Sequence, residues 1–179
     1  LDEFHERSIH ADLGIALARQ AWLARGDLRL VVMSATLDPT RVAAWLGDCP
    51  VVAVPGGSFP LEILSRPEAT VAEAAAEAVA STPGQVLCFL AGAPEIGRAM
   101  PEVRLAAPGL EVVPLHGALP GAEQDAAIGP TTRRRIILST NIAETSLTVP
   151  GVRAVVDTGL HKGARYDPGR AIHTLDTER

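Results

Sequence analysis

The chain has 179 residues, a formal net charge of −5, 47% hydrophobic residues and 3% aromatic residues. This length suits one domain or two small ones, and the hydrophobic content supports a packed aliphatic core rather than a disordered chain. An acidic chain has no overall attraction for nucleic acid, so any such contact must be local. The sequence holds no apolar run of membrane-spanning length. We expect Cys49 and Cys88, which lack CxxC spacing, to be reduced in a cytoplasmic protein.

The opening stretch LDEFHERSIH contains acids and histidines that could belong to a metal site, a nucleotide site or the start of a helix. His5 and His10 are five residues apart, which separates them by about 140° around a helix. This spacing argues against the zinc chelate of an i, i+4 pair. Ser8 is suited to cap a helix, but a cap does not explain Asp2 and Glu3.

Helical and extended patterns alternate within the first 65 residues. Ser8 would cap a helix from Ile9 to about Gly26, and Asp38 followed by Pro39 predicts a second, short helix. The expected strands of this part are residues 28–34, residues 51–54 and, as a strand or the start of a linker, residues 61–65.

The alternation continues after PGGSFP, the strongest break in the chain. The expected helices are 69–80, 94–105 and 120–128, and the expected strands are 85–90, 110–115, 134–140, 152–157 and a short edge strand at 171–175. Strands alternating with helices predict βαβ units, a parallel sheet and an α/β fold. Ligands of such sheets bind beyond the carboxyl ends of the strands.

Polar residues follow the expected strands. Asp2 and Glu3 would follow a strand that lies upstream, and SAT follows the strand that ends at Met33. His116-Gly117 follows another strand, and STNIAETSLT, residues 139–148, follows the RIIL strand. Side chains of these types are suited to phosphate and ribose contacts.

These segments resemble the motifs of DEAH-box ATP-dependent RNA helicases, most closely those of the bacterial HrpB type. DEFHERS resembles the second motif, with Phe4 where the common form has Ala, and SATLD resembles the third. CFLAGAPEI resembles the fourth, PGGSFPLE the stretch between the lobes, and LSTNIAETSLTVPGV followed by VVDTGL the fifth. The resemblance implies two RecA-like lobes with parallel sheets. Residues 1–65 would be the C-terminal part of the first, ATP-binding lobe, and residues 66–179 most of the second lobe.

The resemblance also implies roles for the residues of the first lobe. Asp2 would hold the Mg²⁺ of ATP through water, and Glu3 would orient the attacking water, since phosphoryl transfer needs chiefly positioning and charge stabilisation. His5 would couple the nucleotide site to the other lobe. Ser34 and Thr36 would link hydrolysis to movement of RNA.

In the second lobe, the resemblance implies contacts with RNA or nucleotide from loop residues. These residues are Gly92, His116, Gly117, Thr140, Asn141, Ser146 and Thr148. Two basic stretches, residues 133–135 and 161–170, are read as solvated charged segments more readily than as RNA contacts.

The chain departs from the family pattern in several places. Pro150 replaces the acid usually found in the fifth motif, and Ala171 replaces a usual glycine. Neither the GxxxxGK[ST] phosphate loop nor the QRxGRxGR motif occurs. Because the chain also begins with Leu1, we expect it to be an internal piece of a longer protein. On its own it should hydrolyse ATP negligibly, and sheet edges should be exposed in residues 1–65.

The sequence supports one main interpretation and leaves two others open. The main one is a part of an RNA helicase, a hydrolase that uses ATP and Mg²⁺, acts on RNA, lies in the cytoplasm without membrane contact, and requires the missing flanking segments. The first alternative is a non-catalytic RNA- or protein-binding RecA-like module. The second is another P-loop enzyme, such as a DNA translocase. The oligomeric state is not predicted.

Overall fold

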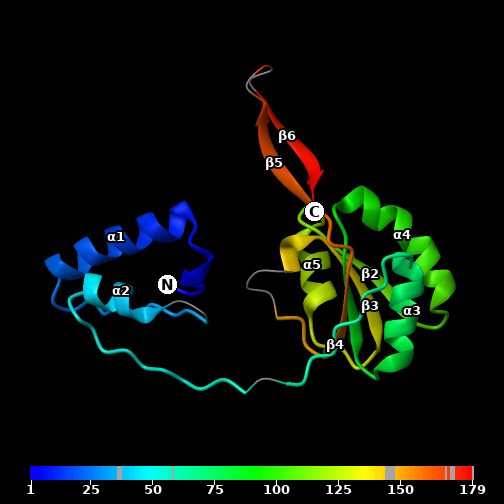
Figure 1. Cartoon of the computed structure of the whole chain (residues 1–179), viewed down its shortest axis with the longest axis horizontal. Helices are drawn as coiled ribbons and strands as arrows, with labels where there is room; N and C mark the ends of the chain where they lie inside the picture. Colours follow the sequence, from blue (N-terminus) through cyan, green and yellow to red (C-terminus); the bar gives the residue numbers. More distant parts are fainter. Residues whose placement is uncertain (36–37, 58, 144–147, 168, 170–171, 179) are drawn as a thin grey trace. The chain divides into compact units, whose positions relative to one another are not determined.

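The computed structural model of the protein describes residues 1–35, 38–57, 59–143, 148–167, 169 and 172–178. The chain divides into two compact units, Leu1–Glu62 and Ile63–Arg179 (Figure 1). The sequence analysis placed a boundary between residues 65 and 66. Assigning each unit to a helicase lobe stays a prediction. No helix among the described residues is both long and apolar enough to cross a bilayer.

Unit 1 contains the helices that the sequence predicts. The 3-10 turn η1 (Phe4–Glu6) precedes α1 (Ile9–Ala24), which Ser8 caps by accepting a hydrogen bond from the Ala11 amide at 3.0 Å. Helix α2 (Pro39–Trp45) begins with proline, and the Asp38 carboxylate accepts from the Thr40 amide. A small core forms where Phe4, Ile15 and Leu46 are buried together.

The strands expected in unit 1 are not formed among its described residues. The side chains of segment 28–33 alternate between half-buried and exposed, as in an extended chain. Among the described residues, its main chain is hydrogen-bonded to Leu1 and Phe4. These contacts are Leu1 N to Val31 O, Met33 N to Leu1 O and Phe4 N to Met33 O. The first of these is donated by the ammonium group of Leu1, so two backbone–backbone bonds are left, and the described residues of this segment form no strand pair. Segments 51–54 and 61–65 also lack strand pairing, which favours the linker interpretation of 61–65.

Unit 2 is built around a parallel sheet, which confirms the predicted α/β class. Its strands are β1 (Gln85–Phe89), β2 (Glu111–Leu115), β3 (Arg135–Ser139) and β4 (Val152–Asp157), in the order β2-β3-β1-β4. Its helices are α3 (Val71–Ser81), α4 (Ala93–Ala106) and α5 (Gly121–Ile128). Each of these elements lies within a few residues of its predicted range.

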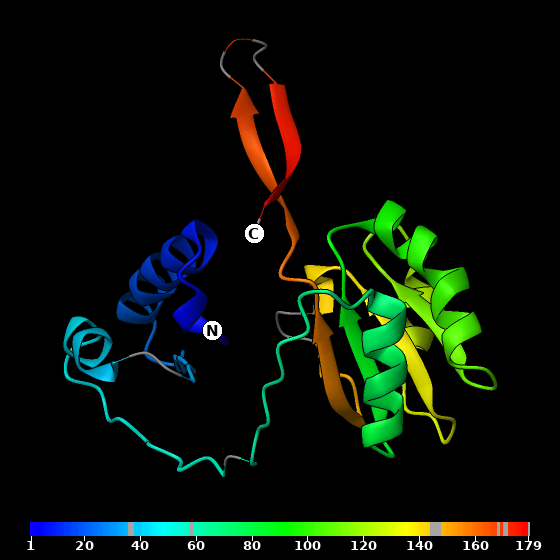
Figure 2. The same ribbon diagram turned by 45° about the vertical axis from the view of Figure 1, so that its right-hand side comes forward.

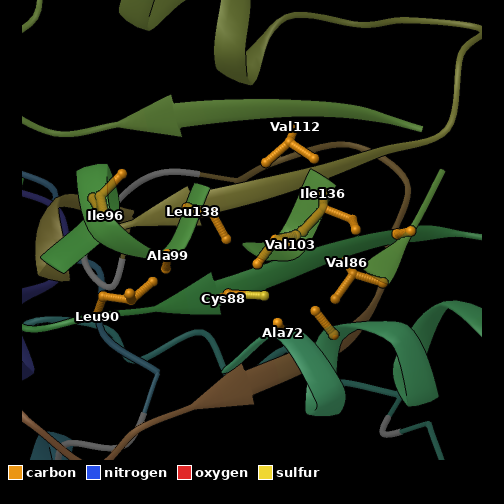
Figure 3. Packing of buried hydrophobic residues seen from close by; sticks show 12 residues of the cluster. Ala72, Val86, Cys88, Leu90, Ile96, Ala99, Val103, Val112, Ile136 and Leu138 are labelled. Carbon is orange, nitrogen blue, oxygen red and sulfur yellow. The ribbon is translucent and has the colours of Figure 1, made fainter. Parts of the chain in front are cut away.

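The helices cover opposite faces of the sheet (Figure 2). Val86 and Cys88 face α3 and α4, whereas Leu87 between them faces α5. Figure 3 shows Ile96, Ala99 and Val103 of α4 packed over the first face. The chain moves one way across the sheet from β1 to β2 and back from β2 to β3, so right-handed crossovers place α4 and α5 on different faces.

The C-terminal part differs from the prediction. The expected short edge strand at 171–175 is β6 (Ile172–Glu178), and it pairs with β5 (His161–Asp167) in an antiparallel hairpin separate from the main sheet. Residues 161–167 of the basic stretch 161–170, which was read as a solvated segment, therefore form β5.

Arg134 and Arg135 do not form the solvated turn that the sequence suggested. Arg135 is only 5% exposed and donates to the Gln85 side-chain oxygen at 2.7 Å and to the carbonyls of Ala126 and Gly129. Arg134 donates to three carbonyls, those of Val79, Thr82 and Gly84. Together they connect the start of β3 to β1 and to the ends of α3 and α5.

Replacing Arg135 by Met should lower the free energy of unfolding of unit 2 by about 2–4 kcal/mol, because buried acceptors lose their donor. Native-state hydrogen exchange of the β1 and β3 amides measures this loss. The exposed neighbour Arg133 is the matched control, and Arg133→Met should change stability by less than about 0.5 kcal/mol. Equal protection in both variants would show that Arg135 is not a structural anchor.

Candidate functional site

The carboxyl ends of the four strands of unit 2 lie in one row. Ser139 at the end of β3 is in register with Phe89 of β1 and Leu115 of β2, and Phe89 is in register with Asp157 of β4. Three backbone bonds extend the pairing by one residue: Leu90 N to Ser139 O, Thr140 N to Leu115 O, and Thr158 N to Phe89 O. The four loops that follow therefore leave the sheet along a single edge.

The loops after β1 and β3 lead to opposite faces. The loop after β1 enters α4 on one face, whereas Ala143 and Val149 of the β3–β4 connection pack with α5 on the other. Adjacent strands whose connections diverge in this way leave a crevice between them, where open α/β sheets bind their ligands. An open pocket lies here, lined by Phe89, Leu90, Ala91, Asn141, Asp157, Gly159, Leu160 and His161.

The predicted residues of this unit lie at that edge. Gly92 is the buried N-cap of α4, His116 and Gly117 follow β2, and Thr140 and Asn141 follow β3. Asn141 is exposed and lines the pocket, as described above. Thr148 is exposed further along the same connection, while Ser146 lies outside the described residues.

Charge at this edge is not predominantly positive. Asp157 contributes a carboxylate, whose Oδ1 accepts from the Gly159 amide at 2.8 Å, and Lys162 is paired with Glu95. The Nδ1 atom of His116 is buried and has no hydrogen-bond partner among the described residues. A phosphate backbone would thus meet mainly neutral donors, such as the Asn141 amide, the Thr148 hydroxyl and backbone N–H groups.

In unit 1, His5 connects the acidic opening to the segment after Met33. Its Nδ1 accepts from the Ala35 amide at 3.4 Å, and its Nε2 lies 3.3 Å from Glu3 Oε2. Because Nδ1 is an acceptor, the proton of a neutral ring resides on Nε2, which faces the Glu3 carboxylate. The second and third motif segments are therefore joined through one imidazole.

The local backbone presents the two acids differently. Glu3 adopts φ 50° and ψ 39°, a left-handed conformation uncommon for a side chain of this size. Asp2 is exposed, and its Oδ1 accepts from the Glu3 amide at 2.9 Å. Ser34 is exposed beside Ala35, and Thr36 lies outside the described residues.

Asp2 carries the carboxylate to which the motif resemblance assigns a magnesium ion. Its second carboxylate oxygen has no partner among the described residues, which leaves it available to a metal-bound water. Across the described part of the chain, no group of three or more His, Cys, Asp or Glu side chains is arranged to hold a metal directly. Magnesium in phosphate chemistry commonly keeps its waters and takes further ligands from the nucleotide.

Two contributions were not anticipated from sequence. Phe4, noted only as a departure from the common Ala, is 4% exposed and anchors the unit 1 core, with the Arg7 guanidinium 5.4 Å from its ring centre. Glu95 and Lys162 form an ion pair across 67 residues of sequence. The presence of an aromatic residue directly after two acids could have indicated the structural role of Phe4. No local sequence pattern indicates the ion pair between Glu95 and Lys162.

A family model described as the helicase conserved C-terminal domain matches residues 70–176. The chain belongs to this family. The match spans the parallel sheet and most of the hairpin, and it includes the segments that resemble the fourth and fifth motifs.

Relatives of this chain within the family are named helicases. It is 42% identical over 191 residues to the ATP-dependent RNA helicase HrpB of Escherichia coli, covering 100% of this chain and 24% of that protein. It is 36% identical over 198 residues to the pre-mRNA-splicing factor ATP-dependent RNA helicase prp22 of Schizosaccharomyces pombe, covering 98% of this chain and 16% of that protein. The chain thus spans about a quarter of HrpB and less of prp22.

Solved structures agree with this relationship. A crystal structure of the E. coli DExH-box NTPase HrpB matches with a TM-score of 0.72 at 40% identity, covering 99% of this chain and 23% of that chain. A second HrpB crystal structure matches with a TM-score of 0.74.

Replacing His5 by Ala should remove the acceptor of the Ala35 amide and speed its hydrogen exchange about fivefold, the effect of losing a bond of about 1 kcal/mol. Exchange measured by NMR at Ala35 tests this. The matched control is the exposed His10 in α1, and His10→Ala should leave Ala35 unchanged. If Ala35 exchanged at the same rate in His5→Ala as in the unmodified chain, His5 would not be what connects the second-motif and third-motif segments.

Proposed function

We propose that the chain is part of an ATP-dependent RNA helicase of the DEAH type, in which the carboxyl edge of the unit 2 sheet contacts RNA. The observation that carries this proposal is the common register row of Phe89, Leu115, Ser139 and Asp157, which brings the loops of the fourth and fifth motifs to one edge. HrpB and prp22 are named as ATP-dependent RNA helicases, in keeping with the proposal.

In this proposal, unit 1 is the C-terminal part of the first lobe and supplies the nucleotide chemistry. Mg²⁺ bound with ATP would neutralise charge on the phosphates, and Asp2 would hold it through water. Glu3 would orient the attacking water, with its carboxylate positioned by the contact to His5. Ser34 and Thr36 would relay the nucleotide state, since His5 already contacts the backbone of this segment at Ala35.

Unit 2 is proposed as most of the second lobe and as the RNA contact. Asn141 and Thr148 are exposed and able to donate to phosphate oxygens. His116 and Gly117, with Gly92, Thr140 and Ser146, belong to the same loops in this proposal. The acidic net charge of −5 agrees with recognition through neutral donors rather than a basic patch.

The remaining parts of the proposal concern the whole protein. The sequence contains no phosphate loop, so ATP hydrolysis would need segments beyond these residues. A cytoplasmic location agrees with the two free cysteines, of which the buried Cys88 has its thiol pKa raised to about 12 by desolvation.

RNA binding by the chain tests the proposal through fluorescence anisotropy with a labelled single-stranded RNA. Thr148→Val and Asn141→Ala should each weaken affinity about tenfold, the effect of losing one hydrogen bond to a charged phosphate. Thr132 is an exposed threonine just before β3, at the opposite edge, and Thr132→Val is the matched control that should not alter affinity.

Competition with DNA of the same sequence separates the alternatives. RNA should displace the labelled strand at lower concentration than DNA does. A clear preference for DNA would favour a DNA translocase. If neither Thr148→Val nor Asn141→Ala weakened RNA binding, the RNA contact would lie elsewhere on the chain. That result would favour the non-catalytic binding module.

A further inference from the structure

The β5–β6 hairpin is a separate two-stranded sheet. Its register runs from His161 opposite Glu178 to Asp167 opposite Ile172. Among the residues that the structure describes, it shares no strand pairing with the four-stranded sheet. Figure 2 shows it standing beyond the carboxyl end of β4. A two-stranded hairpin has little stability of its own, so its direction depends on contacts at its base.

One charged contact connects that base to the body of unit 2. Lys162, the second residue of β5, places Nζ 3.1 Å from Oε2 of Glu95 in the first turn of α4. The two side chains are 27% and 28% exposed, so water screens this pair less than the exposed pairs of the surface. The other Glu95 oxygen, Oε1, is 3.0 Å from the Arg98 guanidinium.

The environment of Glu95 favours the ionised form that pairs with Lys162. The pKa of its carboxyl is lowered, first by a hydrogen bond from its own backbone N–H and then by Lys162 and Arg98. A carboxylate in the first turn of a helix is further favoured by the helix dipole. The acid is therefore charged and oriented close to the start of β5.

Gly92 makes room for the pair. Its φ of −173° is ordinary extended backbone, so the position does not require glycine for conformation. A Cβ added there would lie 2.7 Å from Lys162 Nζ and 2.9 Å from Glu95 Oε2. The ion pair thus occupies the space over Gly92 that any larger residue would fill.

We propose that Lys162, Glu95 and Gly92 form a tether that fixes the direction of the β5–β6 hairpin relative to the loop after β1. Lys162 acts in it as a positioning residue. The tether gives Gly92 a role separate from the nucleic-acid contact predicted from its motif. If the proposed function holds, RNA at the carboxyl edge of the sheet would meet a hairpin of defined orientation. This consequence of the tether rests on the proposed function.

Pulsed electron paramagnetic resonance measures the hairpin direction without RNA. Spin labels at Arg104→Cys, exposed in α4, and at Gly169→Cys, exposed in the hairpin turn, report one distance distribution. A Cys49→Ser background removes the half-buried thiol, and Cys88 stays unlabelled because its side chain is fully buried. The background protein should give a single narrow distribution.

Lys162→Met and Glu95→Gln should each broaden the distribution at least twofold. Gly92→Ala should broaden it less, because the ends of both flexible side chains can shift to make room for one methyl group. The double variant Glu95→Lys with Lys162→Glu exchanges the two charges and should narrow the distance distribution again. Arg98→Met is the control, because Arg98 contacts the same carboxylate from an exposed position (72%), and it should leave the width unchanged.

Unchanged widths in Lys162→Met and Glu95→Gln would overturn the tether. Hydrogen exchange of the β1 and β3 amides is recorded on the same samples. Unchanged exchange rates there show that a broader distance distribution does not come from unfolding of unit 2. RNA affinity is measured separately, so loss of the proposed function and loss of the tether give different results.

Discussion

The parallel pairing of β1 with β3 and β4 is the constraint on which unit 2 depends. Buried backbone donors and acceptors must be paired, and the register that pairs them places Phe89, Ser139 and Asp157 in one row. Once the row is fixed, every loop that follows a strand leaves from the same edge. The arrangement of the candidate RNA contacts is thus a consequence of main-chain hydrogen bonding rather than of the loop sequences themselves.

Unit 1 shows what happens where an extended segment has little main-chain hydrogen bonding. Segment 28–33 has the alternation of a strand, yet two backbone–backbone bonds and one bond from the Leu1 ammonium group join it to Leu1 and Phe4 among the described residues. Val31 and Met33 stay 63% and 49% exposed in consequence. What holds the segment near the acidic opening is the small core around Phe4, together with the hydrogen bond from the Ala35 amide to His5. The motif residues are therefore positioned by side chains more than by a sheet.

Local signals predicted local structure well. The Ser8 cap and the β-branched runs of the main sheet correspond to elements of the structure, since short-range chemistry determines caps and strand propensity. Long-range contacts were the source of error. Arg135 was read as part of a solvated turn because its acceptors, such as Gln85, lie up to 50 residues away. Lys162 was unremarkable in sequence for the same reason, because Glu95 is 67 residues distant.

Site residues were predicted through motif resemblance, and the geometry adds which of them are close together. In the proposed function, RNA meets the carboxyl edge of the sheet rather than the opposite edge, where Arg133 and Arg134 lie. Photo-crosslinking with 4-thiouridine RNA, followed by mass spectrometry of the linked peptides, tests this most directly. We predict crosslinks in residues 116–118 and 140–143. Crosslinks concentrated in residues 131–134 would contradict the account and assign binding to the basic edge.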